Sequence, residues 1–409
     1  MVRNTSPVAS LLASLLLLPS LAACSSDDSG KAPSASPSTD GGGSEQAPAY
    51  DFSKYDEAVN TFLAENGLEG ASGVIVHKKW GVLHTAGYGA FAPDRKYLVA
   101  SSSKIVSVGI LMRLVDQGKL DIDAPIGSVL SAAWGTNAKS DLEVAQLVSN
   151  SSGLVSLTDN PLYGPYLCQY VDGSDLATCA QSIYQTTADA PDRKPPDTEF
   201  HYGGGQWQLA GGVAQVASNE TWADLVTETY VDGCGATTFG YGNQFTQAFS
   251  SGGAPDGGGS LADALAYPPF FQGDPANLHP TTNPSIEGGL YTTAGDYGKV
   301  LLMHLRGGLC DGKRVLSEQA VARMQEDRIG EKYQGKTPSP DLEGYGLGWW
   351  IDRNHPGVFA DPGAYGAVPW LDLSRDYAAF LVIEKDAGVG AQLFTMVKPV
   401  LDDVFDSTN

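Results

Sequence analysis

The 409-residue sequence predicts an α/β fold (in the broader sense, α+β) with two lobes, and three observations support this. Segments typical of strands lie near both ends of the chain. The middle of the chain instead mixes short helical stretches with Gly- and Pro-rich loops. Hydrophobic residues make up 42% of the chain, which is enough for a large core. We expect one lobe built from both ends of the chain, an inserted helical lobe, and a site in the cleft between them.

The first elements expected in the folded part are a helix and a hairpin. Apolar residues recur at helical spacing over residues 51–66. Two short runs, 73–77 and 81–85, are typical of strands, and only three residues separate them. They predict a hairpin directly after the helix.

A buried helix is expected next. Residues 105–115 are apolar on nearly all sides, which is typical of a helix inside a core, and Gly118 is its expected C-terminal stop. Near the other end of the chain, the pattern predicts three consecutive strands and a final helix, at 345–351, 364–371, 377–384 and about 391–405.

The composition excludes several classes of function. The formal net charge is −22, and an acidic surface repels phosphate backbones, so nucleic acid is not expected as a partner. The six histidines have no metal-binding spacing and no CxxC occurs, so neither a metal nor another cofactor is predicted. No G-x-S-x-G segment occurs, which disfavours an α/β-hydrolase triad.

The first residues are predicted to be a targeting segment. The apolar run 11–18 is too short to span a bilayer permanently, and Leu21-Ala22-Ala23-Cys24 resembles the lipobox of bacterial lipoproteins. The resemblance implies a signal peptide over residues 1–23, a lipid on Cys24, and a flexible linker over 24–49. An ordinary secretory signal with an accidental Cys is the alternative. We expect an exported protein that a lipid anchors in the cell envelope, in the outer membrane or facing the periplasm where the cell has two membranes.

Four cysteines remain once Cys24 carries lipid. An even number in an exported chain predicts two disulfides, and sequence alone allows three pairings. We favour Cys168–Cys179, which closes a short loop and leaves Cys234–Cys310. Four free buried thiols are the alternative.

The strongest chemical signal is Ser101-Ser102-Ser103-Lys104, where the buried helix begins. Residues three apart on a helix share a face, so Lys104 can reach the Ser101 hydroxyl. A serine hydroxyl becomes a good nucleophile when a neighbour takes its proton, which a lysine can do if its pKa is lowered. The helix N-terminus adds N–H groups that favour an oxyanion. The alternative is an N-capping serine followed by a surface lysine.

With these residues the chain resembles the serine β-lactamase-like family, which comprises class C β-lactamases, D,D-peptidases and related esterases. The resemblance implies an antiparallel sheet flanked by helices, with an α/β lobe from 50–100 and about 287–409 and a helical lobe from about 101–286. Asn150 stands where the family has a His. Segments in the same order as in the family carry the likeness, at 88–89, 100–104, 120–125, 147–154, 288–296 and 345–349.

By position, the resemblance makes Ser101 the acylated nucleophile and Lys104 its proton partner. The family's second motif, Y-x-N, aligns with Tyr202-Gly203-Gly204. Tyr202 would then be a shared acid and base whose phenol pKa is lowered by Lys104, although a core tyrosine is the alternative. Gly204 lacks the amide that would position the substrate or Lys104, and Gln206 is the candidate to reach in instead.

The third motif, K-T-G or H-T-G, aligns with Asp361-Pro362-Gly363. Gly363 is kept where the backbone approaches the substrate, and the Ala364 N–H could join that of Ser101 as an oxyanion hole. Asp361 replaces the cation that binds the carboxylate of penicillins and D-Ala-D-Ala stems. If Asp361 faces the cleft, it repels that carboxylate by roughly 1 kcal/mol or more. It would also favour the ammonium form of Lys104, and hence Tyr202 as the base.

Together these residues predict a serine hydrolase of the cell envelope that forms an acyl-enzyme on Ser101 and is a poor β-lactamase. The expected substrate is a neutral or cationic ester or amide, or a cell-wall-derived molecule. One alternative is a catalytically impaired relative that binds wall peptide or a partner protein, which the two altered motifs favour. The other is a true penicillin-binding D,D-peptidase or β-lactamase.

Overall fold

A computed structural model describes residues 47–157, 159–160, 162–171, 173–250, 266–329 and 343–408. The predicted signal peptide, Cys24 and most of the predicted linker lie outside these ranges. Within the described ranges, no helix combines the length and the apolar character that crossing a membrane requires.

A seven-stranded antiparallel sheet forms the α/β part of the molecule, in the order β2-β1-β12-β11-β10-β9-β8. Strands from opposite ends of the sequence lie side by side in it, because Ala71 of β1 pairs with Ile383 of β12. The α/β class with an antiparallel sheet is therefore confirmed. The strands are β1 (Gly70–His77), β2 (Gly81–Gly89), β8 (Glu343–Tyr345), β9 (Trp350–Asp352), β10 (Val358–Ala360), β11 (Ala367–Asp372) and β12 (Tyr377–Ile383).

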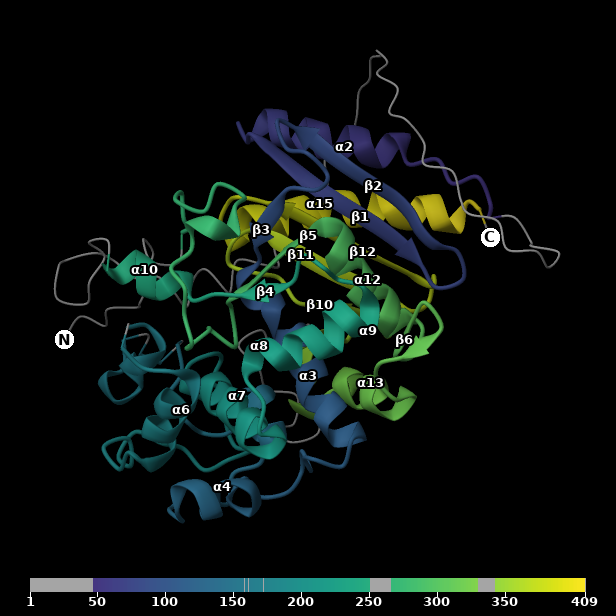
Figure 1. Cartoon of the computed structure of the whole chain (residues 1–409). Coiled ribbons are helices and arrows are strands. Elements are labelled where there is room, and N and C mark those ends of the chain that lie inside the picture. The colour runs from purple at the N-terminus through teal and green to yellow at the C-terminus, as the bar shows by residue number, and fades with distance from the viewer. Residues whose placement is uncertain are drawn as a thin grey trace, which may run out of the picture.

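Helices cover both faces of this sheet (Figure 1). Helices α2 (Ser53–Glu65) and α15 (Ala387–Asp406) pack on one face, and α12 (Ala294–Leu305) packs on the other. Side chains alternate along a strand, so Ala379 and Leu381 of β12 pack with α2 and α15, whereas Phe380 faces the other way. The Phe380 ring stacks on Tyr297 of α12 at 4.3 Å between centroids. The fully buried β12 is therefore the centre of two cores.

The remaining elements are mainly helical and surround α3 (Lys104–Asp116), which is buried along most of its length. In Figure 1, α4, α6 and α7 lie at the opposite end of the molecule from α2. These helices are α4 (Gly127–Trp134), α5 (Val144–Val148), α6 (Leu176–Gln185), α7 (Gly205–Ser218), α8 (Trp222–Val226), α9 (Asp232–Cys234), α10 (Gln244–Ser250) and α13 (Glu318–Gln325). Short helical turns are η2 (Ala100–Ser103), η3 (Gly164–Gln169), η4 (Thr227–Val231) and η5 (Pro275–Asn277). A three-stranded sheet has the order β3 (Lys96–Leu98), β5 (Leu290–Thr293), β4 (Gly240–Tyr241). A two-stranded sheet pairs β6 (Leu309–Cys310) with β7 (Lys313–Arg314).

The structure corrects one predicted strand. The single strand expected over 345–351 is wrong, because the chain reverses there and forms the hairpin of β8 and β9. Gly348 has a φ of +83°, a conformation that glycine adopts without strain, and Gly346 N donates to Trp349 O across the turn. The predicted helix over 105–115 is present as α3, and Gly118 follows it with a φ of +67°.

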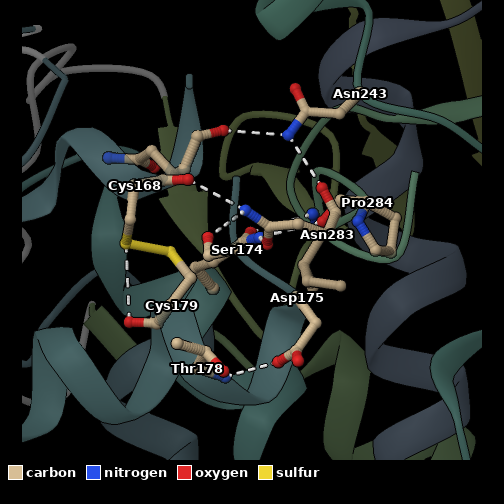
Figure 2. The surroundings of a disulfide bond; sticks show 11 residues. Cys168, Ser174, Asp175, Thr178, Cys179, Asn243, Asn283 and Pro284 are labelled. Carbon is tan, nitrogen blue, oxygen red and sulfur yellow. Dashed lines mark hydrogen bonds between the residues drawn. A yellow bond between two sulfur atoms is a disulfide. The ribbon is translucent and has the colours of Figure 1, made fainter. Parts of the chain in front are cut away.

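Two disulfides pair the four cysteines as predicted, Cys168 with Cys179 and Cys234 with Cys310. Figure 2 shows that the first bond joins the end of η3 to α6. Asn283 lies beside it and donates to Cys168 O at 2.8 Å, and Asn243 donates to Asn283 O at 2.8 Å. The disulfide is therefore part of a hydrogen-bonded corner that also holds the segment leading to residue 287.

Candidate active site

Ser101 lies in η2, directly before α3, on a backbone turn with an unusual conformation. Ala100 has a φ of +46°, in the left-handed region that non-glycine residues rarely adopt. Surrounding elements hold this turn, because Ser103 Oγ donates to Ala100 O at 2.6 Å and Tyr297 Oη donates to Ser102 O at 2.7 Å. Ser101 is half-buried, whereas Ser102 and Ser103 are fully buried. The turn thus leaves one of the three serines within reach of a substrate.

Lys104 and Tyr202 meet at this serine. Lys104 has no exposed surface, and its Nζ donates to Ser101 Oγ at 3.2 Å. The same Nζ lies 4.7 Å from the centre of the Tyr202 ring, and the Tyr202 phenol is hydrogen-bonded to the Ser101 side chain. The structure therefore brings together the three residues that the motifs single out.

Asn150, which stands where the family has a His, holds the loop that carries Tyr202. Its Oδ1 accepts from Gly203 N at 3.0 Å and from Trp207 Nε1 at 2.9 Å. Asn150 has a φ of +57°, and Asn tolerates this region better than most residues. A further bond joins His201 Nδ1 to Asp159 Oδ2 at 2.6 Å. The phenol position is therefore set by the elements on either side of its loop.

The ionisation of the Lys104–Tyr202 pair differs from the prediction in one respect. Burial raises the pKa of Tyr202, and the Lys104 ammonium offsets this only in part, so the expected lowering of the phenol pKa is wrong. Burial works against the ammonium of Lys104, but Tyr202, Glu287 and Asp361 outweigh it and raise the lysine pKa. The resting site therefore holds an ammonium beside a neutral phenol.

Gly204 and Gln206 do not supply the missing amide. Gly204 has a φ of +91°, and a Cβ there would lie 3.0 Å from both Ser156 Cα and Val155 O, so a side chain at this position meets neighbouring backbone. Gln206 is fully buried, accepts from Ser152 Oγ and donates to Asn150 Oδ1. The idea that Gln206 reaches into the cleft is therefore wrong, because its hydrogen bonds all lie within the wall behind Tyr202.

The residue that reaches Lys104 is Glu287, which sequence reasoning missed. Its Oε2 lies 3.4 Å from Lys104 Nζ, and its backbone oxygen accepts from the same nitrogen at 3.2 Å. The carboxylate is one-tenth exposed. The available signal was its position directly before Gly288-Gly289-Leu290, a segment that resembles the family, where a charged residue beside a buried turn is unusual.

Asp361 does not face the cleft. It has no exposed surface, and its Oδ2 accepts from Ile105 N at 3.3 Å at the beginning of α3. Burial raises its pKa well above the usual range, and Lys104 offsets this only in part. Because Asp361 is buried away from the cleft, the expected repulsion of a substrate carboxylate by this residue fails. The cation that the third motif normally carries is still missing.

The third-motif segment packs against the turn that carries the nucleophile. A Cβ at Gly363 would overlap the Val99 carbonyl oxygen, and Ser102 Oγ donates to Asp361 O at 2.6 Å. The segment lies between β10 and β11, and Ala364 follows Gly363 at the partly exposed surface. Only glycine fits at position 363. The pairing of the Ala364 and Ser101 N–H groups as an oxyanion hole stays a prediction.

An aromatic cluster lines the Tyr202 side of the site. The Trp350 ring stacks on Tyr202 at 5.7 Å between centroids, and Phe200 lies 5.7 Å from Trp350. Both Trp350 and Phe200 are partly exposed, whereas Tyr345 behind them is fully buried. Within the described ranges, no cluster of three or more His, Cys, Asp or Glu could hold a metal ion.

The order of the motifs along the chain agrees with a comparison to known protein families. The chain belongs to the Beta-lactamase family, because a family model of that description matches residues 55–393. Members of this fold family include penicillin-binding protein homologues, esterases and acyltransferases.

Individual proteins similar to the chain come from several lineages. Penicillin-binding protein 4 of Amycolatopsis lactamdurans is 24% identical over 360 residues, which cover 85% of this chain and 88% of the relative. EstCE1, described as a hydrolase with promiscuous acyltransferase activity, superposes with a TM-score of 0.64 at 16% identity over 87% of this chain and 98% of that chain. Simvastatin synthase (LovD) from Aspergillus terreus superposes with a TM-score of 0.60 at 17% identity, over 85% of this chain and 97% of that chain. At these identities the solved structures establish the fold alone.

Proposed function

We propose that this protein is a serine hydrolase that forms an acyl-enzyme on Ser101. The observation that carries the proposal is the contact of a half-buried serine hydroxyl with a fully buried lysine at 3.2 Å, beside the Tyr202 phenol. A nucleophile within hydrogen-bonding distance of its proton partners is the arrangement that covalent catalysis requires.

In this mechanism the reactive form of the site has one proton fewer than the resting form. It holds the Lys104 ammonium beside a Tyr202 phenolate, and the ammonium stabilises the phenolate through their proximity. Ser101 Oγ attacks the carbonyl carbon while its proton passes to the phenolate. The phenol then gives this proton to the departing alcohol or amine. In the second half of the reaction, the Tyr202 phenolate takes a proton from water while the water oxygen attacks the acyl carbon. The phenol then returns this proton to Ser101 Oγ, and the acid is released.

This mechanism makes turnover depend on pH in a specific direction. Because the pKa values of Lys104 and Tyr202 are both raised, the deprotonated form is scarce at neutral pH and increases above it. We therefore expect kcat/KM to rise with pH through the neutral and mildly alkaline range.

The substrate class we propose is a neutral or cationic ester or amide. No cation stands at the third motif, and the Glu287 carboxylate lies 3.4 Å from Lys104 Nζ, the proton partner of Ser101 in this proposal. Both features disfavour a substrate carboxylate beside Ser101, so penicillins and D-Ala-D-Ala stems are poor substrates in this proposal. The partly exposed Trp350 and Phe200 favour an apolar group on the substrate.

The experiment compares the wild-type protein with Ser101→Ala. Nitrophenyl acetate turnover and fluorophosphonate labelling are expected in the wild type and absent in the variant, whose circular dichroism and melting temperature stay unchanged. Unlabelled wild-type protein would support the catalytically impaired binding protein instead. Stable capture of a fluorescent penicillin at Ser101 would support the penicillin-binding alternative.

We also propose that the protein acts in the cell envelope, anchored by a lipid on Cys24. The two disulfides fit an oxidising compartment, which supports export. In cells, Cys24→Ala is expected to move the protein from the membrane fraction to the soluble fraction, and mass spectrometry of the native N-terminal peptide should find an acylated cysteine. An unmodified N-terminus in the membrane fraction would contradict this.

A further inference from the structure

We propose that Glu287 is a positioning residue of this active site, which replaces from a different segment the amide that the second motif lacks. The inference rests on the proposed function, because it concerns the proton partner of Ser101. The carboxylate contacts Lys104 and does not touch the serine, so it acts through the lysine.

The Glu287 carboxylate lies directly against a glycine of the second motif. A Cβ at Gly203 would lie 2.9 Å from Glu287 Oε2, closer than real side chains approach. At Gly204 a side chain would instead meet the backbone of 155–156. Position 204 is therefore crowded by backbone, whereas the space beside position 203 holds the Glu287 carboxylate that contacts Lys104.

The backbone around Glu287 is held on both sides, as a positioning role requires. Ser107 Oγ of α3 donates to Ile286 O at 2.6 Å, and Gln244 Nε2 of α10 donates to Gly288 O at 2.9 Å. Lys104 lies on α3 as well, so the same helix fixes both members of the pair. The backbone that carries the carboxylate is thus held on both sides of Glu287.

Glu287 also forms an ion pair with Lys104. The groups that act electrostatically on Lys104 are Tyr202, Glu287 and Asp361, and burial raises the pKa of Asp361 well above its usual range. The remaining titratable groups that sense Glu287 are the phenols of Tyr170 and Tyr345, whose pKa values burial raises. The Glu287 carboxylate therefore balances the buried ammonium, and it raises the pKa of both Lys104 and Tyr202.

Two separable effects follow for Glu287→Gln. The amide removes a negative charge from beside Lys104 and Tyr202, so less alkaline conditions suffice to generate the reactive form. We expect the rising limb of the kcat/KM profile to move down by about one pH unit. The amide also holds the lysine less firmly, so the alkaline plateau is expected to fall about tenfold. A residue that merely stabilised the fold would not change the pH at which kcat/KM rises. It would also leave unchanged the ratio of kcat/KM on the alkaline plateau to kcat/KM on the rising part of the profile.

The experiment measures nitrophenyl acetate kcat/KM and the rate of fluorophosphonate labelling against pH for the full-length protein. Glu287→Asp keeps the charge at a shorter reach, so its limb should stay at the wild-type pH while its plateau falls. The matched control is Glu220→Gln, which removes the carboxylate of a partly exposed ion pair with Lys119 (2.8 Å) outside the site, and its profile should equal that of the wild type. Melting temperatures confirm that each variant is folded.

The outcomes separate the two proposals. Labelled wild-type protein with an unshifted limb and plateau in Glu287→Gln overturns the role of Glu287 and leaves the serine hydrolase intact. Wild-type protein that is neither labelled nor active overturns the hydrolase, and the role of Glu287 with it. If Glu287→Gln does not fold, an unshifted plateau in Glu287→Asp overturns the positioning role.

Discussion

The backbone N–H of Ile105 donates to Asp361 Oδ2 at 3.3 Å, so the residue that replaces the family's cleft-facing cation belongs to the interior beneath α3. The other carboxyl oxygen of Asp361 is buried and has no hydrogen-bond partner among the described residues. A helix N-terminus favours negative charge, but one N–H does not compensate for full desolvation. This explains why burial raises the pKa of Asp361 well above its usual range.

Asp361→Asn is therefore expected to stabilise the protein at neutral pH. Above about pH 4 the unfolded chain ionises Asp361, whereas the raised pKa keeps it protonated to a higher pH in the folded chain, so the wild type loses stability as the pH rises above about 4. Asn cannot ionise and avoids about 1.4 kcal/mol for each unit of raised pKa. Urea unfolding at pH 4 and pH 7 tests this, and an equal effect of the substitution at both pH values would contradict it.

Lys104 and Glu287 should be thermodynamically coupled independently of any activity. Lys104→Met leaves a carboxylate with one-tenth exposure and no ammonium beside it, which is expected to lower the free energy of unfolding by roughly 3 kcal/mol. Adding Glu287→Gln to Lys104→Met should recover part of this loss. The four unfolding free energies of the cycle are measured by chemical denaturation. Additive losses would mean that the two side chains do not stabilise each other.

Ala100→Gly is expected to relieve backbone strain. At a φ of +46° alanine is strained and glycine is not, so the substitution should raise stability by roughly 1 kcal/mol despite the greater freedom of glycine in the unfolded chain. Ala58→Gly in the middle of α2 is the matched control and should lower stability by about 1 kcal/mol. Thermal unfolding compares the two, and losses of the same sign would refute strain at Ala100.

The two disulfides should differ in what their removal does. Cys168 and Cys179 are 11 residues apart, whereas Cys234 and Cys310 are 76 apart. From loop-closure entropy, the double variant Cys168→Ser/Cys179→Ser is expected to lose about 3 kcal/mol of its free energy of unfolding. The double variant Cys234→Ser/Cys310→Ser is expected to lose about 4.5 kcal/mol. Denaturation without reductant measures both. A larger loss from the short loop would show that native contacts around Cys168 outweigh the chain entropy.

Because His304 is buried, we expect the protein to lose stability in mild acid. It is fully buried, neither ring nitrogen has a partner among the described residues, and burial lowers its pKa to about 4. The unfolded chain protonates this His near pH 6.5, so its contribution is complete above that pH and is lost as the pH falls toward 4, by about 3 kcal/mol. His304→Phe should flatten the acid limb of the stability curve, whereas His355→Gln on the surface should leave it unchanged. If the free energy of unfolding falls equally with decreasing pH in the wild type and in His304→Phe, this prediction is refuted.

The parts of the site that sequence predicts are those set by local spacing. Lys104 reaches Ser101 because both lie within one helical turn, and Tyr202 follows from a motif placed in the right order along the chain. Glu287 could not be found in this way, since its contact with Lys104 joins residues 183 positions apart. Gln206 was misplaced because the phase of α7 relative to Asn150, and so the direction of its side chain, is set by packing.

The direction of Asp361 is a similar case. Its alignment with the third motif identifies the position but not whether the carboxyl faces solvent or the N-terminus of α3. The hairpin of β8 and β9 was missed for a different reason, because a glycine within an apolar run is compatible with both a continuous strand and a turn. Fold class and disulfide pairing needed less detail and were predicted.

The register of β1 with β12 determines when during synthesis the sheet beside the Ser101 site can be completed. Ser101 emerges early from the ribosome, yet β1 can pair only with β2 until residues 377–383 arrive, and Gly363 reaches the serine turn only with that late part of the chain. In the proposed hydrolase, the Ser101 site is consequently incomplete in a growing chain until the segment that carries Gly363 and the last strands has been made.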